Sequence, residues 1–476
     1  MAREERRLDP ALAPAGALAP IGQDLEHPAT KTSPARDGAH LPLTRTQAAM
    51  IAGAGLLVAL GVALVPGRAL TAIHDLFFAV FLLGGVTRLA AACAPVSAAP
   101  PPAVPDEDLP TYTIIAPLYR EAEVVGELLR NLEALDYPRE RLQALIVLEA
   151  DDDRTLSAVR ALPLPAFVQV LIAPPGAPKT KPRACNHALE RARGELVVIY
   201  DAEDMPDPGQ LREAAARFAV SDPRLACLQA PLRIEDPGFS LFLPSQFRLE
   251  YAAHFEVLLP ALARWGLTFP LGGTSNHFKT SALRAVGAWD AYNVTEDADV
   301  GFRLAAAGYR LDVITRPTWE TAPTTLGQWF PQRARWIKGH MQTLAVHSRG
   351  AVMRQPRHAV ALVLTLAQSV TSSHLHGPVM LVAVVAAAID YWPDARLDMP
   401  VADLMLYALG WGSAAIAGAR GVLRAGGRPR FLHLFGMAGY WILQSAAAAR
   451  ALHQFVTDPH RWDKTLHVPR SGRVGP

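Results

Sequence analysis

The sequence LVVIYDAED, residues 196–204, joins a short apolar run to three acidic side chains. A run of β-branched and aromatic residues of this length predicts a buried strand that ends at Tyr200. Asp201, Glu203 and Asp204 are then expected at the carboxyl end of that strand, the edge at which an open α/β sheet binds ligands. Carboxylate oxygens are hard ligands that suit Mg²⁺ or Mn²⁺. A solvated acidic turn is the alternative for such a triplet taken alone.

The region from Tyr112 to Leu344 alternates short apolar segments with charged, helix-forming segments. This alternation predicts a doubly wound α/β sheet with helices on both faces. We expect strands at Tyr112–Ala116, Leu142–Leu148, Phe167–Ile172 and Leu196–Tyr200, and helices at Glu121–Leu135 and Arg183–Arg193. Strands of such a sheet carry their ligands at the carboxyl ends, so acids that follow different strands are expected to face one crevice.

A second acidic cluster follows the expected strand Leu142–Leu148. Its members are Glu149, Asp151, Asp152 and Asp153, and such a density of negative charge repels itself unless cations or hydrogen-bond donors lie nearby. At a sheet edge, one of these carboxylates is suited to accept hydrogen bonds from a base or ribose. Helix capping is the alternative role for Asp152 or Asp153.

Composition and two N-terminal apolar runs indicate a membrane protein. Half of the 476 residues are hydrophobic and 19% are charged. Ala48–Val65 is uncharged and close to the ~20 residues that a helix needs to cross a bilayer. A second run, Leu76–Ala94, contains Arg88 near its far end, where a long side chain is expected to reach the headgroups. Two crossings return the chain to its starting side.

Apolar runs resume after the predicted sheet domain, at Ala359–Leu366, Pro378–Ile389, Val401–Ala417 and Phe431–Ala449. The stretch Gln368–His376 is too polar for lipid contact, so we expect the first run to lie along the interface and about three crossings to follow. Basic residues flank the last run on both sides, which conflicts with the positive-inside rule for a full crossing. The side of the C-terminal tail stays open.

These patterns divide the chain into five parts. We expect a disordered tail at 1–46, two transmembrane helices at 47–95, a cytosolic domain at 110–345, an interfacial helix with about three membrane helices at 356–452, and a basic tail at 453–476. The first apolar run begins too far from the N-terminus for a secretory signal.

Charge and cysteine content exclude some classes. A net charge of +2 gives no electrostatic reason for a nucleic-acid partner. Cys93, Cys185 and Cys227 lie far apart without metal-ligand spacing, and they imply no disulfide framework. We therefore expect the sheet domain in a reducing compartment.

Two further motifs carry chemistry. Glu296 and Asp297 precede a helical stretch, where Asp297 is either a helix cap or a general base that takes a proton from a hydroxyl. The motif QRARW ends the sheet region: its Arg335 offers a planar fork to phosphate oxygens, and its Trp336 offers a flat face to a sugar ring or to the membrane interface.

Taken in order, these motifs resemble the family 2 glycosyltransferases, particularly the membrane-integrated branch with cellulose, hyaluronan and chitin synthases. The resemblance covers Tyr112 to Trp336. It implies a GT-A-like mixed sheet flanked by transmembrane and interfacial helices. It also implies that Pro117, Tyr119, Glu121, Lys181, Asp201 and one or both of Glu149 and Asp151 bind the nucleotide sugar.

The same resemblance assigns the catalytic motifs. Asp201 and Glu203 match a DxD motif that binds Mg²⁺ or Mn²⁺, and Asp297, preceded by Glu296, matches the base of a TED motif. Acceptor or product binding is assigned to Gly272, Gly273, Thr274, Gln332, Arg335 and Trp336. The glycines permit close backbone approach, although a simple turn is an alternative reading of that segment.

The sequence departs from the family pattern at two places. Glu203 stands where Asp is usual, so Asp204 is a rival to it as a metal ligand. Acids at 149 and 151 stand where two adjacent acids are common, which leaves Glu149 and Asp151 as alternatives. The ending Asp458–His467 is similar to a recurrent ending of bacterial membrane family 2 transferases, and it suits a headgroup interface or a return to the catalytic domain.

The resemblance implies an inverting glycosyltransferase in a bacterial inner membrane, with its catalytic domain in the cytoplasm. The expected partners are a UDP-sugar donor, a glycan or lipid acceptor, membrane lipids and export proteins. Processive polysaccharide synthesis is one form of this reaction. One alternative is a catalytically silent nucleotide- or sugar-binding component of an export assembly. Another is a pump or channel, but the apolar runs lack the paired acids that such a protein would need.

Overall fold

A computed structural model describes residues 38–95, 101–236, 242–349, 355–390 and 401–462. The predictions for residues 1–37 of the N-terminal tail and 463–476 of the C-terminal tail lie outside these residues.

The sheet domain is built on seven strands with the order β3-β2-β1-β4-β8-β6-β9. Its strands are β1 Tyr112–Leu118, β2 Leu142–Glu149, β3 Val168–Ala173, β4 Leu196–Ile199, β6 Leu225–Gln229, β8 Asn276–Lys279 and β9 Arg310–Val313. All neighbouring pairs are parallel except those of β8, which runs antiparallel to β4 and β6. The predicted mixed α/β sheet is confirmed, and the four predicted strands lie within two residues of their expected bounds.

Strand alternation produces two cores, one on each face of the sheet. Along β1, Ile114 packs into one apolar cluster and Ile115 into the other, because successive side chains point to opposite faces. The first face is covered by α3 Val125–Glu133, α4 Asp153–Arg160 and α6 Gln210–Val220, and the second by α5 Lys181–Arg191, α9 Thr280–Ala285, α10 Glu296–Ala306 and α11 Leu326–His347. The sheet edge between these layers is where the acidic strand ends lie.

A second, three-stranded sheet has the order β5-β10-β7, with β5 Met205–Pro206, β7 Leu232–Ile234 and β10 Thr318–Glu320. Beyond β7, the chain forms α7 Phe242–Ala253, the π-helical turn η3 His254–Leu258 and α8 Leu259–Arg264. Short 3₁₀ turns, η1 Asp106–Asp108 and η2 Arg139–Arg141, precede β1 and β2.

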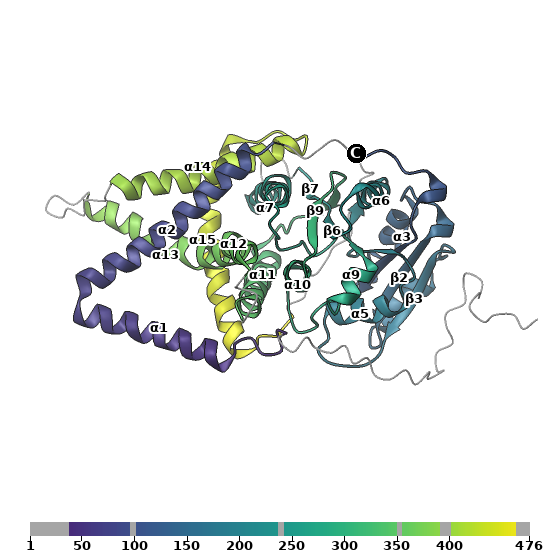
Figure 1. The fold of residues 1–476 in the computed structure, drawn as a ribbon, viewed down its shortest axis with the longest axis horizontal. Coiled ribbons are helices and arrows are strands. Elements are labelled where there is room, and N and C mark those ends of the chain that lie inside the picture. Colours follow the sequence, from purple (N-terminus) through teal and green to yellow (C-terminus); the bar gives the residue numbers. More distant parts are fainter. Residues whose placement is uncertain (1–37, 96–100, 237–241, 350–354, 391–400, 463–476) are drawn as a thin grey trace, which may run out of the picture.

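Three helices among the described residues are long and apolar enough to cross a membrane: α1 Arg45–Leu64, α2 Pro66–Cys93 and α14 Val401–Arg424. With α13 Gln368–Asp390 they form one end of the molecule, and β1 to β3 lie at the other, with α7, α10 and α11 between (Figure 1). The helices expected at 47–95 are therefore present, while the number of crossings stays a prediction.

The polar stretch Gln368–His376 forms part of a helix. It follows α12 Pro356–Leu362 and the π-helical turn η5 Val363–Ala367 directly and forms the first turns of α13. In α12, Ala361 and Leu362 pack against Phe302 of α10, so this helix lies on the sheet domain.

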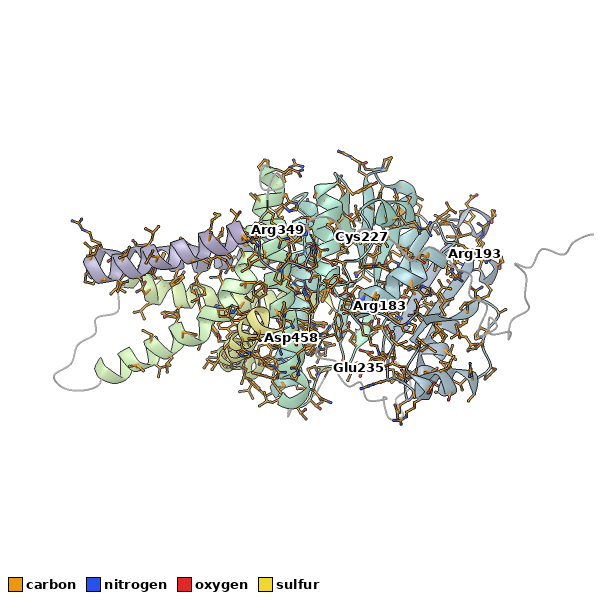
Figure 2. The ribbon with its side chains drawn as sticks, turned by 90° about the horizontal axis from the view of Figure 1, so that it is seen from below. Arg183, Arg193, Cys227, Glu235, Arg349 and Asp458 are labelled. Carbon is orange, nitrogen blue, oxygen red and sulfur yellow. The ribbon has the colours of Figure 1, made fainter. Side chains whose placement is uncertain are left out.

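The last described helix, α15 Phe431–Thr457, returns the chain to the sheet domain. Its Ala447, Ala448 and Ala451 join the apolar cluster that also contains Ile337 of α11. The turn after α15 is held by Lys338, whose Nζ donates to the carbonyl oxygen of Arg461 at 2.7 Å. Asp458 accordingly lies beside the sheet domain in Figure 2.

Candidate active site

A cavity of about 600 Å³ begins at the carboxyl ends of β1 and β2 and continues between the apolar helices. Its lining includes residues of β1, α5, α10 and α11 at one end and of α2, α13 and α14 at the other. The cavity therefore connects the sheet edge, where the sequence predicts donor binding, with the membrane-type part of the chain.

Most residues predicted to bind the donor lie together at the sheet end of this cavity. Pro117, Tyr119, Glu121 and Glu149 all line it, whereas Asp151 is exposed and forms an ion pair with Lys179 at 2.5 Å. Of the two alternatives at the end of β2, the structure favours Glu149.

Glu149 is buried and ion-paired with Arg183 of α5, which is labelled in Figure 2. Burial raises the pKa of this carboxyl, and the Arg183 guanidinium opposes the shift. Asp152 has a different role, because its side chain accepts a hydrogen bond from the Thr155 amide at 3.2 Å and caps α4. The capping alternative is thus confirmed for Asp152.

The acids after β4 divide into two that line the cavity and one that does not. Asp201 and Glu203 line it. Asp204 is 1% exposed; its Oδ2 accepts the amide proton of Asp201 at 2.7 Å and the hydroxyl of Thr274. Burial raises the pKa of Asp204 well above its ordinary value, with the Asp201 charge adding to the shift. Asp204 therefore braces the turn, which leaves Asp201 and Glu203 to face a ligand.

Lys181 links the donor end of the cavity to the predicted catalytic motif. Its Nζ pairs with the carboxylate of Asp201 and donates to the carbonyl oxygen of Gly273 at 2.6 Å. Burial lowers the pKa of Lys181, but the charges of Asp201 and Glu296 outweigh burial and raise it above its ordinary value. The ammonium group is thus charged and lies among carboxylates that would otherwise repel each other.

Asp297 and Glu296 open α10 and both line the cavity. Burial raises the pKa of both carboxyls. The charge of Asp297 adds to the shift of Glu296. The Ala298 amide, which donates a hydrogen bond to Asp297 at 2.7 Å, opposes the shift of Asp297. A Cβ at Gly273 would lie 3.2 Å from Oδ2 of Asp297, so the lack of a side chain there leaves room for the carboxylate. A carboxyl with a raised pKa is suited to accept a proton near neutral pH.

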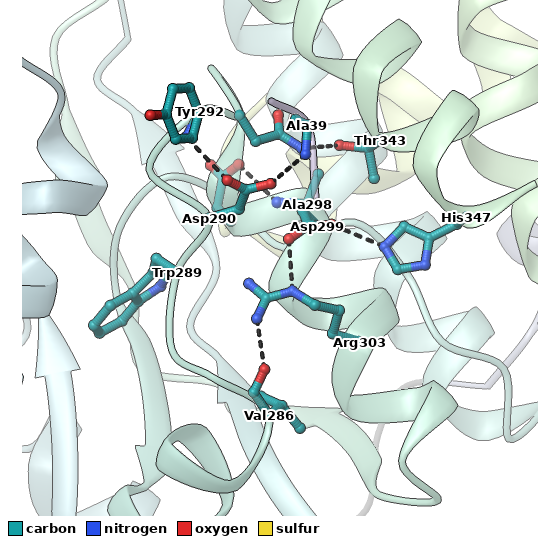
Figure 3. A network of polar contacts seen from close by, with 12 residues as sticks. Ala39, Val286, Trp289, Asp290, Tyr292, Ala298, Asp299, Arg303, Thr343 and His347 are labelled. Carbon is teal, nitrogen blue, oxygen red and sulfur yellow. Dashed lines mark hydrogen bonds and ion pairs between the residues drawn. The ribbon is translucent and has the colours of Figure 1, made fainter. Parts of the chain in front are cut away.

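A buried polar network holds α10 in place behind Asp297 (Figure 3). Asp299 accepts from Arg303 Nε at 2.7 Å and contacts His347 of α11 at 2.9 Å. Burial acts to raise the pKa of Asp299, but Arg303 and His347 lower it to about 2. Arg303 also donates to the carbonyl oxygen of Val286 at 2.7 Å. The helix start that carries Asp297 is therefore linked to α11 through the contact between Asp299 and His347.

Gln332, Arg335 and Trp336 of α11 line the same cavity. Oε1 of Gln332 is buried without a hydrogen-bond partner among the described residues. The guanidinium of Arg335 lies 4.5 Å from the ring centroid of Trp462, which also lines the cavity. Trp462 belongs to the ending whose role the sequence left open, and its contact favours the return to the catalytic domain.

Three charged residues at the cavity were missed by sequence reasoning. Arg333 forms two hydrogen bonds with Glu250, at 2.7 and 2.6 Å. The third residue, Glu320, lies near Asp201 and Glu203. Burial raises the pKa of Glu320, and the charges of Glu203 and Asp201 add to that shift. Neither Glu250 nor Glu320 belongs to a motif, and Arg333 occupies an unassigned position inside QRARW.

The fit of a divalent cation rests on Asp201 and Glu203. Among the described residues no group of three or more His, Cys, Asp or Glu side chains is arranged to hold a metal. Mg²⁺ commonly uses one or two protein carboxylates together with substrate phosphates and water. Two cavity-lining carboxylates beside a donor pocket fit that mode of binding.

Comparison with known proteins finds a family model that matches the sheet domain. Residues 110–339 match the model described as "Glycosyltransferase like family 2". The chain is 25% identical over 241 residues to the probable glycosyltransferase YdaM of Bacillus subtilis, an alignment over 49% of this chain and 56% of that protein. It is 27% identical over 240 residues to a poly-beta-1,6-N-acetyl-D-glucosamine synthase of Staphylococcus aureus, over 50% of this chain and 56% of that protein. The chain thus spans about half the length of the curated relatives it matches.

Among solved structures, the mannosyltransferase PcManGT from Pyrobaculum calidifontis, in complex with GDP-Man and Mn²⁺, has a similar fold. The TM-score is 0.56 at 23% identity, over 82% of this chain and 98% of that one. The fold and the acidic sheet edge define a GT-A domain. The chain contains a glycosyltransferase family 2 domain, which occupies residues 110–339.

Proposed function

We propose that this protein is an inverting glycosyltransferase that moves a sugar from a nucleotide-diphosphate sugar to a glycan or lipid acceptor at the cytoplasmic face of a membrane. One observation carries the proposal: Asp297 lines a cavity that reaches the expected donor residues at one end and the apolar helices at the other. Donor and acceptor would then enter from opposite ends and meet at this carboxylate. The resemblance to a polysaccharide synthase makes repeated transfer one form of the reaction.

In this mechanism the acceptor hydroxyl loses its proton to Asp297 as its oxygen bonds to the anomeric carbon, and the bond from that carbon to the diphosphate breaks. The product has the anomeric configuration opposite to that of the donor. The Lys181 ammonium, which is ion-paired with Asp201, would lie close to the departing diphosphate, and Arg335 would offer a second cation. Both act where negative charge develops.

A divalent cation bound by Asp201 and Glu203 would neutralise charge on the leaving diphosphate. The relative solved with GDP-Man and Mn²⁺ supports the choice of Mn²⁺ or Mg²⁺. The expected UDP-sugar is one donor to test, and GDP-Man is another. Three helices apolar enough to cross a membrane support an integral membrane protein, for which we propose the bacterial inner membrane.

Asp297→Asn tests the proposal, because it removes the base while keeping the size of the side chain. Purified full-length protein would be incubated with sugar nucleotides and Mn²⁺, and nucleoside diphosphate release would be measured beside nucleotide binding. Loss of a general base typically costs about 10²–10⁴-fold in rate, and we expect binding to change little. Asp153→Asn, at an exposed acid of α4, is the matched control and should keep wild-type turnover.

The same assay addresses the silent alternative. A folded wild-type protein that binds nucleotides but releases no nucleoside diphosphate with any donor and acceptor tested would favour a binding component of an export assembly.

A further inference from the structure

Arg88 of α2 lines the cavity at the end that lies between the apolar helices. Its Nε donates to the hydroxyl of Ser413 on α14 at 3.1 Å, so the side chain crosses between the two helices. Among the described residues, no carboxylate forms an ion pair with Arg88. A guanidinium has five N–H donors, and this hydrogen bond uses one of them.

Arg88 lies near the level at which α2 meets the catalytic domain. Ala91 and Ala92, one turn further along α2, pack with Val257 and Ala261 of the catalytic domain. A helix rises 1.5 Å per residue, so Arg88 lies roughly 5 Å on the membrane side of that contact. A phosphate carried on a lipid would lie at this level.

The other polar side chains that α2 and α13 contribute to the cavity lining are hydroxyl, amide and imidazole groups. They are Thr87, Gln368, Ser369, Ser372, Ser373 and His376. Glu250, an acid of α7 that also lines the cavity, is already bound by Arg333 through two hydrogen bonds. This end of the cavity therefore carries a positive charge without a protein counter-charge among the described residues.

An arginine that is enclosed among helices without an ion-pair partner is costly to bury, so such a residue usually marks a functional site. Its planar fork matches two oxygens of a phosphate, and polar hydroxyl and amide groups around it can hydrogen-bond the remaining oxygens. A neutral glycan would leave the charge uncompensated. The chemistry of this end thus favours an anionic phosphate ester over a neutral chain.

We propose that Arg88 binds the phosphate of a lipid-linked acceptor, whose sugar hydroxyl extends along the cavity to Asp297. This assignment rests on the proposed function, and it selects the lipid-linked class among the acceptors named above. The apolar tail would pass between the exposed faces of α2 and α14, which carry Leu82, Val86 and Ile416.

The test is equilibrium binding of a radiolabelled long-chain polyprenyl monophosphate to the full-length protein in neutral detergent, without donor. Unlabelled polyprenyl monophosphate, the uncharged polyprenol and phosphatidylglycerol serve as competitors. We expect the monophosphate to compete at least about tenfold better than polyprenol, since charged hydrogen bonds are the strong ones. Equal competition by polyprenol would overturn the phosphate site. Equal competition by phosphatidylglycerol would overturn the acceptor and identify a bilayer-lipid site.

Arg88→Gln should weaken binding by about tenfold to a hundredfold, while Arg88→Lys keeps the charge and should lose less. Arg68→Gln removes an exposed cation from the same helix and should have no effect. Unchanged binding in Arg88→Gln would contradict the assignment. If that variant fails to fold, the wild-type comparison of monophosphate with polyprenol still decides. Because the assay contains no donor, failure of the proposed function would show instead as absent nucleotide release with lipid binding intact.

Discussion

The contact between Gly273 and Asp297 allows a small, quantitative perturbation of the proposed base. A Cβ at position 273 would lie 3.2 Å from Oδ2 of Asp297, which is shorter than ordinary contacts of 3.4–4 Å. Gly273→Ala should therefore push the carboxylate by a few tenths of an ångström without removing it. The carbonyl oxygen of Gly273 that binds Lys181 is backbone and stays.

The expected size of the effect follows from the sensitivity of catalysis to position. A misplacement of about 1 Å can cost about 10²-fold in rate, so a few tenths should cost about threefold to tenfold in kcat. On the transition-state scale this corresponds to roughly 0.7–1.4 kcal/mol. The assay is nucleoside diphosphate release under donor saturation, with nucleotide affinity measured separately and expected to stay within about twofold.

Gly126→Ala is the matched control, because a Cβ there would meet atoms at 3.7 and 3.9 Å, which is ordinary contact. Alanine inside helix α3 should stabilise the protein by roughly 0.5–1 kcal/mol and leave kcat unchanged. A Gly273→Ala variant with wild-type kcat, or one that loses nucleotide affinity as much as turnover, would refute the role given to Asp297 and its surroundings.

Three further predictions concern the rest of the site. Glu149→Gln should weaken nucleotide binding about tenfold in calorimetric titrations. Asp151→Asn, which removes one member of an exposed ion pair, should change the affinity by less than about threefold. A larger loss in Asp151→Asn than in Glu149→Gln would assign the pocket to Asp151. Trp462→Ala should lower kcat by about threefold to thirtyfold, the range of a cation–π contact, and Trp462→Phe should recover much of it; equal losses would argue against stacking on Arg335. Burial raises the pKa of Asp297 above the ~3.9 of an ordinary aspartate, so kcat should fall as the pH is lowered through that raised pKa. A rate that stays constant down to pH 4 would contradict a base with a raised pKa.

The sequence predicts the parts of this protein that are local in the chain. The strand before Asp201 and the one before Glu149 are short apolar runs with acids at their ends, and both form as expected. Local pattern also offers Asp152 or Asp153 as a helix cap, and the structure shows that Asp152 caps α4. Both acidic strand ends reach one cavity because parallel strands align their carboxyl ends.

Contacts between distant segments could not be predicted in this way. Glu320 reaches the cavity because β10 pairs with β7, a strand more than eighty residues earlier in the chain. Trp462 reaches Arg335 only because α15 packs against α11. The polarity of Gln368–His376 indicates that these residues avoid lipid. It does not distinguish an interface from a cavity wall, and the structure shows that several of them line the cavity.

The central claim is single-displacement transfer with Asp297 as the base, and the anomeric configuration of the product tests it most directly. The purified protein would be given an anomerically labelled sugar nucleotide and the acceptor that supports turnover, and the new linkage would be assigned by NMR. The account predicts the configuration opposite to that of the donor, so an α-linked donor gives a β-linked product. A product that retains the donor configuration would contradict it.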